Sequence, residues 1–540
     1  MSAIGHFTFV LHSHLPHVQP HRYYAGTWFY DILAETYLPL LNMLHELHHD
    51  GVKYHLTMSF SPILLEQLAD PAHLEHFDHY LQEKIRFAEH DIAHFAEKSP
   101  DTHLHFLAGW YKSWYENLRE SFNKRFNRDI IGGFNTLAQA GLIELITSAT
   151  THAYLPLLKD DRSIKAQLQS AMIIHQRHFG TAPKGIWLPE CGYKPGMEKF
   201  VGDMGLQFFF TEAHPIIGGQ PMGVASGDVL GLYGEVKRRY MPPPITQIPP
   251  RKQIKTLRPH WVGENDISSG VAVFGRDNRT GQQVWSNDWG YPADFDYREL
   301  RKKSGTGGLR YWRVTGAKVD LTHKDLYHPE WASYKVDQHA EHFVHVVGDV
   351  LREFYNESSE FGFIASTFPT DLFGYRWFEG VQWLGKVLRH LGNNPEIAFS
   401  TPSTYLAQYP PKTILSLPES SWGYGGAHFM WSNAETAWMW RIIHQAEARM
   451  IILASEYGNP SDIQRQTLNR MVRQLMQLQT SDWLWHVTLM QEREYAIGRF
   501  YEFYEQFTKL ADSLKLDVAL PMSADEAHGL MDVDYRWYAD

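Results

Sequence analysis

The chain of 540 residues is too long for a single hydrophobic core, so the sequence predicts one large domain and at least one smaller one. Its formal net charge of -11 argues against a nucleic-acid partner, and its only cysteine, Cys191, excludes an internal disulfide framework and a thiolate metal cluster. The start lacks a signal-peptide pattern and no apolar run is long enough to span a bilayer, so we expect a cytoplasmic protein without a membrane partner.

Seven short apolar runs, each followed by polar residues, recur along the chain. They lie at residues 5–11, 54–60, 142–147, 185–188, 205–210, 270–274 and 361–366. Helical spacing of apolar residues predicts helices between them, at 31–49, 62–99, 117–132 and 163–179. Because strands that alternate with helical crossovers form parallel sheets, the pattern predicts an α/β fold with a barrel or near-barrel.

Loops and a change of pattern set the expected domains. Residues 218–256 are rich in Gly and Pro and include the basic patch Lys237-Arg238-Arg239, interpreted as a solvated loop over one mouth of the barrel. From about 434 to 514 the pattern is long amphipathic helix. We expect a barrel domain at 1–395, with insertions at about 62–132 and 218–256, and a helical domain at 396–540 that contributes to the cleft.

Polar residues gather at the predicted carboxyl ends of the strands, where parallel α/β proteins keep their chemistry. Glu190 follows an apolar run and stands between Pro189 and Cys191, a poor position for an ordinary solvated carboxylate. This position predicts that Glu190 is a catalytic group. The alternative is that Glu190 caps a neighbouring helix or pairs with an arginine. The other strand-end groups are His12, His14, His152, Glu212, His214, Asp277 and the segment 368–371.

Aromatic residues are frequent, with 18 Trp and 28 Tyr, and aromatic faces stack on sugar rings. Carboxylates and imidazoles at a common mouth, with tryptophans in nearby loops, favour carbohydrate chemistry. A retaining glycosidase needs two carboxyl groups about 5 Å apart, one as nucleophile and one as acid. Glu190 is the candidate nucleophile.

Five sequence blocks, in order, resemble those of glycoside hydrolase family 57, and most resemble its 1,4-α-glucan branching enzymes. The blocks are 12–16 (His-Ser-His-Leu-Pro), 144–158, 187–190 (Trp-Leu-Pro-Glu), 372–380 and 421–423 (Ser-Trp-Gly). The resemblance implies a seven-stranded (β/α) barrel with a C-terminal α-helical domain. It also implies retaining chemistry on α-1,4-glucans such as amylose or glycogen, without a metal or another cofactor.

The resemblance assigns roles to particular residues. Glu190 matches the nucleophile of the family. His12, His14, His152, Asp288 and Trp422 match residues at the substrate site of the family. The further expected substrate-binding residues, which are not assigned by the resemblance, are Trp28, Trp289, Trp377 and Trp431. Each of two residues has an open alternative. His14 could be a strand-end histidine with satisfied hydrogen bonds, and Trp422 could pack between the two domains.

The block that carries the general acid in the family is altered. Pro369 occupies the place of the acid, and proline can neither give nor accept a proton. General acid catalysis is worth roughly 10²- to 10⁴-fold in rate. Asp371 is a possible substitute, but two residues of extended chain place it roughly 6–7 Å further along, unless a bulge shortens the path.

Three functional hypotheses follow. The first is a branching enzyme in which Glu190 forms the glucosyl-enzyme, with activity reduced or lost because of Pro369. The second is a homologue that binds α-glucan or regulates its metabolism without turnover. The third is a metal-dependent polysaccharide deacetylase or amidohydrolase, suggested by His12 and His14 on alternate residues, with His152, His214 and Asp288 as further ligands.

Overall fold

A curled parallel sheet forms the centre of the computed structural model, which describes residues 3–20, 27–98, 102–222, 236, 239–240, 245–286, 289–305, 307–523, 526, 528 and 531–539. Its seven parallel strands are β1 (Gly5–Ser13), β2 (Leu56–Phe60), β3 (Ile143–Ser148), β4 (Gly185–Trp187), β5 (Phe208–Thr211), β7 (Ile267–Gly275) and β8 (Gly362–Pro369). They follow the order β7-β5-β4-β3-β2-β1-β8. Every apolar run of the sequence therefore forms a strand, and the predicted α/β barrel fold is confirmed.

The sheet almost closes between β7 and β8. These two strands meet at a single parallel bridge, between Arg276 and Ala365. Three short strands extend the sheet: β6 (His260–Glu264) runs antiparallel to β7, β9 (Ile397–Phe399) pairs with the start of β1, and β10 (Ile414–Leu415) pairs with β6. Two of them come after residue 395, so the sheet extends beyond the predicted end of the barrel domain.

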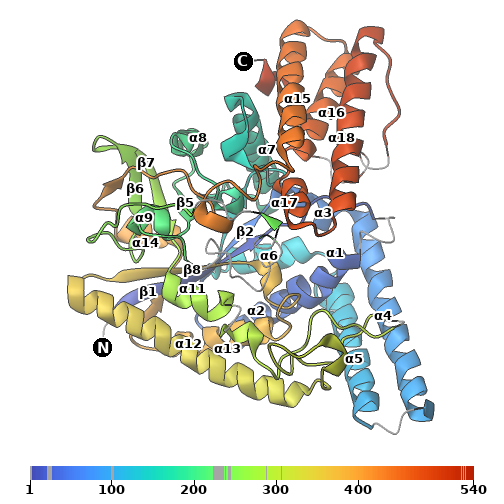
Figure 1. Cartoon of the computed structure of the whole chain (residues 1–540), viewed down its shortest axis with the longest axis vertical. Helices are drawn as coiled ribbons and strands as arrows, with labels where there is room; N and C mark the ends of the chain where they lie inside the picture. Colours follow the sequence, from blue (N-terminus) through green and yellow to red (C-terminus); the bar gives the residue numbers. More distant parts are fainter. Residues whose placement is uncertain are drawn as a thin grey trace.

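Helices cover the outside of the sheet because the strands are apolar on both faces; in β1, for example, only His6 is not buried. The helices of the barrel part are α1 (Thr27–Ile32), α2 (Leu38–His49), α3 (Pro62–Ala69), α4 (Pro71–Lys98), α5 (Thr102–Glu120), α6 (Ile130–Gln139), α7 (Asp161–Phe179), α8 (Met197–Asp203), α9 (His214–Ile217), α11 (Asn278–Trp285), α12 (Pro329–Ser358), α13 (Gly380–Gly392) and α14 (Pro402–Gln408). The long hairpin of α4 and α5 projects from one end of the molecule (Figure 1).

The structure differs from two of the predicted helices. The helix expected at 62–99 is two helices, because Pro71 starts a new one after Asp70. The helix expected at 117–132 straddles a break, since Asn127 and Arg128 have φ of 48° and 65°, which a helix cannot contain. Asp129 then caps α6 by accepting the backbone N–H of Gly132.

The C-terminal helices are α15 (Ala437–Glu456), α16 (Asp462–Leu478), α17 (Ser481–Leu489) and α18 (Arg493–Ser513). In Figure 1, α15, α16 and α18 stand together beside the barrel, while the short α17 lies against it. A bridge between Ala153 and Thr480 and a hydrogen bond from Tyr154 N–H to the Gln479 carbonyl attach the start of α17 to the segment after β3. This attachment brings a C-terminal helix to the carboxyl ends of the barrel strands.

The described part of the 218–256 insertion lies over the same end of the barrel. The Gly219 and Ile248 backbones pair with each other, and Thr246 N–H donates to the Gly425 carbonyl, in the loop that follows Trp422. Lys237 and Arg238 of the predicted basic patch lie outside the described residues. In the described part of the chain, no helix has the length and apolarity needed to cross a membrane.

Candidate active site

Glu190 stands on a sharp turn directly after β4. Residues Pro189–Cys191 form a 3₁₀ turn in which Glu190 and Cys191 have φ of 61° and 50°. Non-glycine residues rarely adopt this left-handed conformation, and such strain gathers at functional sites. Two hydrogen bonds hold the turn, from Trp422 N–H to the Glu190 carbonyl and from Cys191 N–H to the Leu188 carbonyl, both 2.9 Å.

The Glu190 carboxylate is 8% exposed and makes two side-chain hydrogen bonds. The indole N–H of Trp422 donates to Oε2 at 2.5 Å, and the Ser481 hydroxyl lies 2.8 Å from Oε1. Burial, helped by the charge of nearby Asp482, raises the pKa of Glu190 to about 8, although both hydrogen bonds act to lower it. At neutral pH this carboxyl therefore holds its proton for most of the time.

A chain of polar side chains leads away from Glu190 into the barrel. The Ser481 Oγ lies 2.8 Å from His152 Nδ1, and His152 Nε2 lies 2.8 Å from His12 Nε2. Nδ1 of His12 in turn lies 3.1 Å from the Ser59 hydroxyl. Two predicted histidines thus connect the candidate nucleophile to β2.

The direction of this chain depends on the proton of Glu190, because each link needs one donor and one acceptor. When Glu190 is ionised, Ser481 donates to it and accepts from His152. When Glu190 is protonated, it can donate to Ser481, and each later link reverses. Burial, together with neighbouring histidines, lowers the pKa of His12 and His152 well below the usual range, so both rings are neutral. The two tautomers of neutral imidazole suit the two directions.

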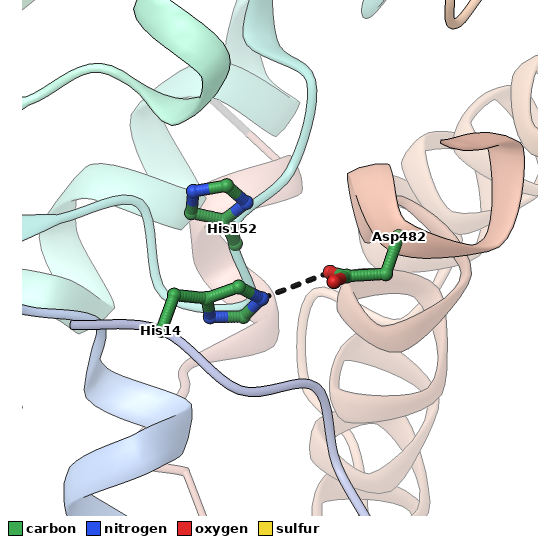
Figure 2. Close-up of side chains that lie close together, drawn as sticks. All are labelled: His14, His152 and Asp482. Atoms are coloured by element: carbon green, nitrogen blue, oxygen red, sulfur yellow. Dashed lines mark hydrogen bonds and ion pairs between the residues drawn. The ribbon is translucent and has the colours of Figure 1, made fainter. Parts of the chain in front are cut away.

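His14 also lines the cavity and connects the end of β1 to α17. Figure 2 shows its ring pointing toward Asp482 of α17. Its Nε2 lies 2.8 Å from Asp482 Oδ2, and its Nδ1 lies 2.8 Å from the Ser61 hydroxyl. Burial acts to raise the pKa of Asp482, but the charge and hydrogen bond of His14 outweigh it and lower that pKa to about 2. Asp482 is therefore a fixed negative charge beside Glu190.

The third hypothesis needs a metal at these histidines. His14, His152 and Asp482 each offer one ligand atom, and these atoms lie within 4.8 Å of one another. However, the His14 and His152 rings stack, with centroids 4.0 Å apart and planes 9° apart (Figure 2). The lone pairs of imidazole lie in the ring plane, so two stacked rings do not direct them to a common point. The arrangement suits hydrogen bonding better than tetrahedral coordination.

Pro369, which the sequence comparison puts at the predicted place of the general acid, lines the same cavity as Glu190. Pro369 is the last residue of β8 and pairs in register with His12 of β1. Asp371, two residues later, also lines this cavity, and its Oδ2 forms an ion pair with Arg376 Nε at 2.8 Å. The cavity has a volume of about 190 Å³ and is lined by His12, His14, His152, Glu190, Trp285, Pro369, Asp371, Arg376, Trp422, Asp482, Trp485, His486 and Gln491.

The remaining predicted substrate-binding tryptophans lie outside this cavity. Trp28 is half-buried in α1, and Trp289 is 56% exposed in a separate cavity with Tyr291 and Asp294. Trp377 is 2% exposed, and Trp431 is fully buried. The two buried rings pack in the core, Trp377 on Trp383 and Trp431 on Tyr154.

Asp288 lies outside the described residues, so its position gives no information on its role. Of the predicted substrate-binding residues, His12, His14, His152 and Trp422 line the cavity. Their contact with a sugar stays a prediction.

Sequence reasoning missed the contribution of α17, which supplies Ser481, Asp482, Trp485 and His486. The available signal was the polar pair Ser481-Asp482 at the start of an aromatic segment, directly after a long amphipathic helix. Trp285 was also missed as a lining residue.

Two other carboxylates at strand ends, Glu212 and Asp277, have structural partners: one pairs with an arginine and the other caps a helix. Glu212 Oε1 lies 2.9 Å from Arg276 Nη1, with both side chains buried, and Asp277 caps α11 by accepting from Thr280. Arg276 also lies over the Trp422 ring, 5.9 Å from its centroid. It therefore supports the indole that donates to Glu190.

Comparisons with known proteins agree with this geometry. The family model of glycosyl hydrolase family 57 matches residues 8–418, and the model of the C-terminal part of 1,4-alpha-glucan branching enzymes matches residues 442–538. The chain is 37% identical over 530 residues to the 1,4-alpha-glucan branching enzyme TK1436 of Thermococcus kodakarensis, covering 94% of this chain and 74% of that protein.

Solved structures of branching enzymes superpose on nearly the whole of this chain. The GH57-type branching enzyme from Pyrococcus horikoshii is 33% identical, with a TM-score of 0.87 over 99% of this chain and 97% of the other. The crystal structure of TK1436 in complex with glucose is 34% identical, with a TM-score of 0.86 and the same coverage. The sequence matches and the barrel that carries Glu190 together establish that the chain belongs to glycosyl hydrolase family 57.

Proposed function

We propose that this chain binds α-1,4-glucans and performs retaining, branching-type glycosyl transfer at a strongly reduced rate. The observation that carries the proposal is the setting of Glu190, held by Trp422 and Ser481 in a cavity shared with Pro369. The resemblance to branching enzymes along the full chain supports the substrate class. The proposal keeps the cytoplasmic location predicted from the sequence.

The first half of the reaction needs Glu190 as an anion. Its carboxylate attacks the anomeric carbon of the donor glucan, and the bond from that carbon to the leaving oxygen breaks. The 6-hydroxyl of an acceptor glucan then attacks the anomeric carbon of the glucosyl-enzyme and gives its proton to a base, which forms the branch and breaks the bond to Glu190. In a retaining mechanism the group that acted as the acid takes this proton. Because burial raises the pKa of Glu190 to about 8, the fraction of anion at pH 7 is only about one tenth.

The second requirement is a proton for the leaving oxygen, and here the cavity is deficient. Pro369 has no proton to give. Asp371 forms an ion pair with Arg376. The pKa of Asp482, near 2, leaves that group ionised at neutral pH. The loss of the acid corresponds to roughly 10²- to 10⁴-fold in rate, or about 3–5 kcal/mol.

The same observation favours a second candidate function, glucan binding without turnover. If no group in the cavity can supply the proton, the protein keeps its ligand and loses catalysis. Such a protein would bind glycogen or regulate its metabolism.

The experiment compares a natural donor with an activated one. We expect the protein to consume α-maltosyl fluoride, since fluoride leaves without a proton, and to form few α-1,6 linkages from amylose, measured by proton NMR. The matched variant Glu190→Gln should abolish both reactions. Glucan binding without reaction on either donor would select the second candidate, and an absence of binding and of reaction would refute both.

A further inference from the structure

A second cavity lies on the outer side of the barrel and shares no lining residue with the Glu190 cavity. It has a volume of about 530 Å³ and lies between α2, α5, α13 and the start of α12. Its lining is rich in aromatic and aliphatic side chains, among them Trp110, Trp114, Tyr327, Phe378 and Met43. A volume within the range of small-molecule sites and an aromatic lining are the features of a binding site.

Two tryptophans form one wall of this second cavity. Trp110 and Trp114 stand one turn apart on α5, so their side chains lie side by side. Their ring centroids are 6.5 Å apart and their planes differ by only 11°. Phe378 packs edge-on against both, at 5.9 and 5.5 Å. Both indoles are partly exposed, so their parallel rings give this wall an aromatic character.

A buried carboxyl group faces the same cavity. Glu379 is 3% exposed, and its Oε1 accepts the backbone N–H of Arg298 at 3.0 Å. Its Oε2 is buried, and the hydrogen bond of Tyr327 to this carboxyl acts to lower its pKa. Burial raises the pKa of Glu379 above its usual value. Gln382 and Ser333, hydrogen-bonded to each other at 2.9 Å, add an amide and a hydroxyl to the wall.

We propose that this cavity is a second α-glucan-binding site, separate from the active site. Sugar rings offer an apolar face that stacks on indole and hydroxyls that bond to carboxyl, amide and hydroxyl groups. An α-1,4-glucan presents successive rings along one chain, which matches two parallel indoles in a row on α5. The inference rests on the proposed function, because it takes the ligand class from it.

The position of this second cavity relative to the active site gives the proposal a purpose. Asp371 and Arg376 line the Glu190 cavity, while Phe378 and Glu379, only a few residues later, line the second one. A glucan polymer held at the second cavity raises the effective concentration of its other segments at the active site. Short ligands that reach only one of the two sites do not gain from this effect.

The test measures binding in the Glu190→Gln background, which prevents turnover. Retardation of the protein in native gels that contain glycogen, and calorimetric titration with β-cyclodextrin, are compared for the background and for the double variant Trp110→Ala and Trp114→Ala. Two lost stacking contacts predict about tenfold weaker binding or more. Trp438→Ala is the matched control, since Trp438 is also partly buried and lies on α15, beside Phe500 and Tyr501. Its glycogen affinity should stay unchanged.

A second pair of variants guards against misfolding. The aromatic replacements Trp110→Phe and Trp114→Phe should retain part of the glycogen affinity, and the midpoint of thermal unfolding reports whether each variant folds. With Glu190 intact, the alanine double variant should turn over α-maltosyl fluoride at the rate of the natural protein.

Three results bear on the two proposals separately. Unchanged glycogen affinity in the folded alanine variant, with loss of affinity in Trp422→Ala, would overturn the second site and leave the proposed function intact. Equal weakening in the Trp438→Ala control would also overturn it. No glycogen binding by the background protein would count against both.

Discussion

Restoring an acid at position 369 is the sharpest perturbation of this site. Pro369 ends β8 opposite His12, lines the Glu190 cavity and has φ of -67° and ψ of 138°, which aspartate adopts without strain. The change Pro369→Asp therefore puts a carboxyl group at the predicted position of the acid. Its cost in stability is about 0.4–1 kcal/mol, from the greater freedom of the unfolded chain without this proline.

The expected gain depends on the leaving group. With amylose the leaving oxygen needs a proton, so we expect branching activity to rise by roughly 10²- to 10⁴-fold, equivalent to about 3–5 kcal/mol of barrier. With α-maltosyl fluoride the first step needs no proton, so the initial release of fluoride should change little, whereas steady turnover still needs a base for the acceptor hydroxyl. The assay counts α-1,6 linkages by proton NMR in the first case and fluoride release by electrode in the second.

Pro369→Asn is the matched control, because asparagine has nearly the same shape but cannot act as an acid. If both variants fold and are equally active on amylose, the missing acid is not the limitation and the reasoning fails. It also fails if the natural protein already branches amylose quickly and Asp371→Asn abolishes that activity, since Asp371 would then be the acid.

Three further changes test the electrostatics of the site and the scaffold. Glu190→Gln should become more stable relative to the natural protein as the pH rises from about 4.5 to about 8, because in that range Glu190 loses its proton in the unfolded chain and retains it in the folded protein. Thermal unfolding midpoints of both proteins across this range measure the effect. A difference between the two midpoints that does not change with pH would contradict the raised pKa. Trp422→Phe removes a hydrogen bond that favours the anion, so the pH profile of α-maltosyl fluoride consumption should shift upward, while an unshifted profile would show that this bond is unimportant. Glu35→Ala should cost about 3–5 kcal/mol in urea unfolding, because it leaves the buried guanidinium of Arg298 without its carboxylate and Arg310 with only the more distant Asp31; a loss below 1 kcal/mol would contradict that estimate.

The sequence was sufficient for the parts of the fold that depend on local patterns. Each apolar run that ends in polar residues forms a parallel strand, and the place of Glu190 follows from that rule. The helix expected at 117–132 was wrong because apolar spacing continues across Asn127 and Arg128, whose left-handed conformation leaves no mark in the spacing.

The direction of side chains and the contacts between distant segments could not be predicted from the sequence. Trp377 and Trp422 both stand in conspicuous motifs, but one ring packs in the core and the other donates to Glu190. Ser481 and Asp482 reach the site from nearly 300 residues further along the chain. Only the attachment of α17 to the segment after β3 brings them there, and that contact is tertiary.

The raised pKa of Glu190 and the proline at position 369 affect different steps, which can be separated by pH. The raised pKa of Glu190 disfavours the anion that forms the glycosyl-enzyme, and a rise in pH toward 8 increases the fraction of that anion. Consumption of α-maltosyl fluoride should rise with it. Higher pH does nothing for the proton that Pro369 cannot supply, so branching of amylose should stay slow throughout. A parallel rise on both donors would mean that ionisation of Glu190, and not the missing acid, limits the natural reaction.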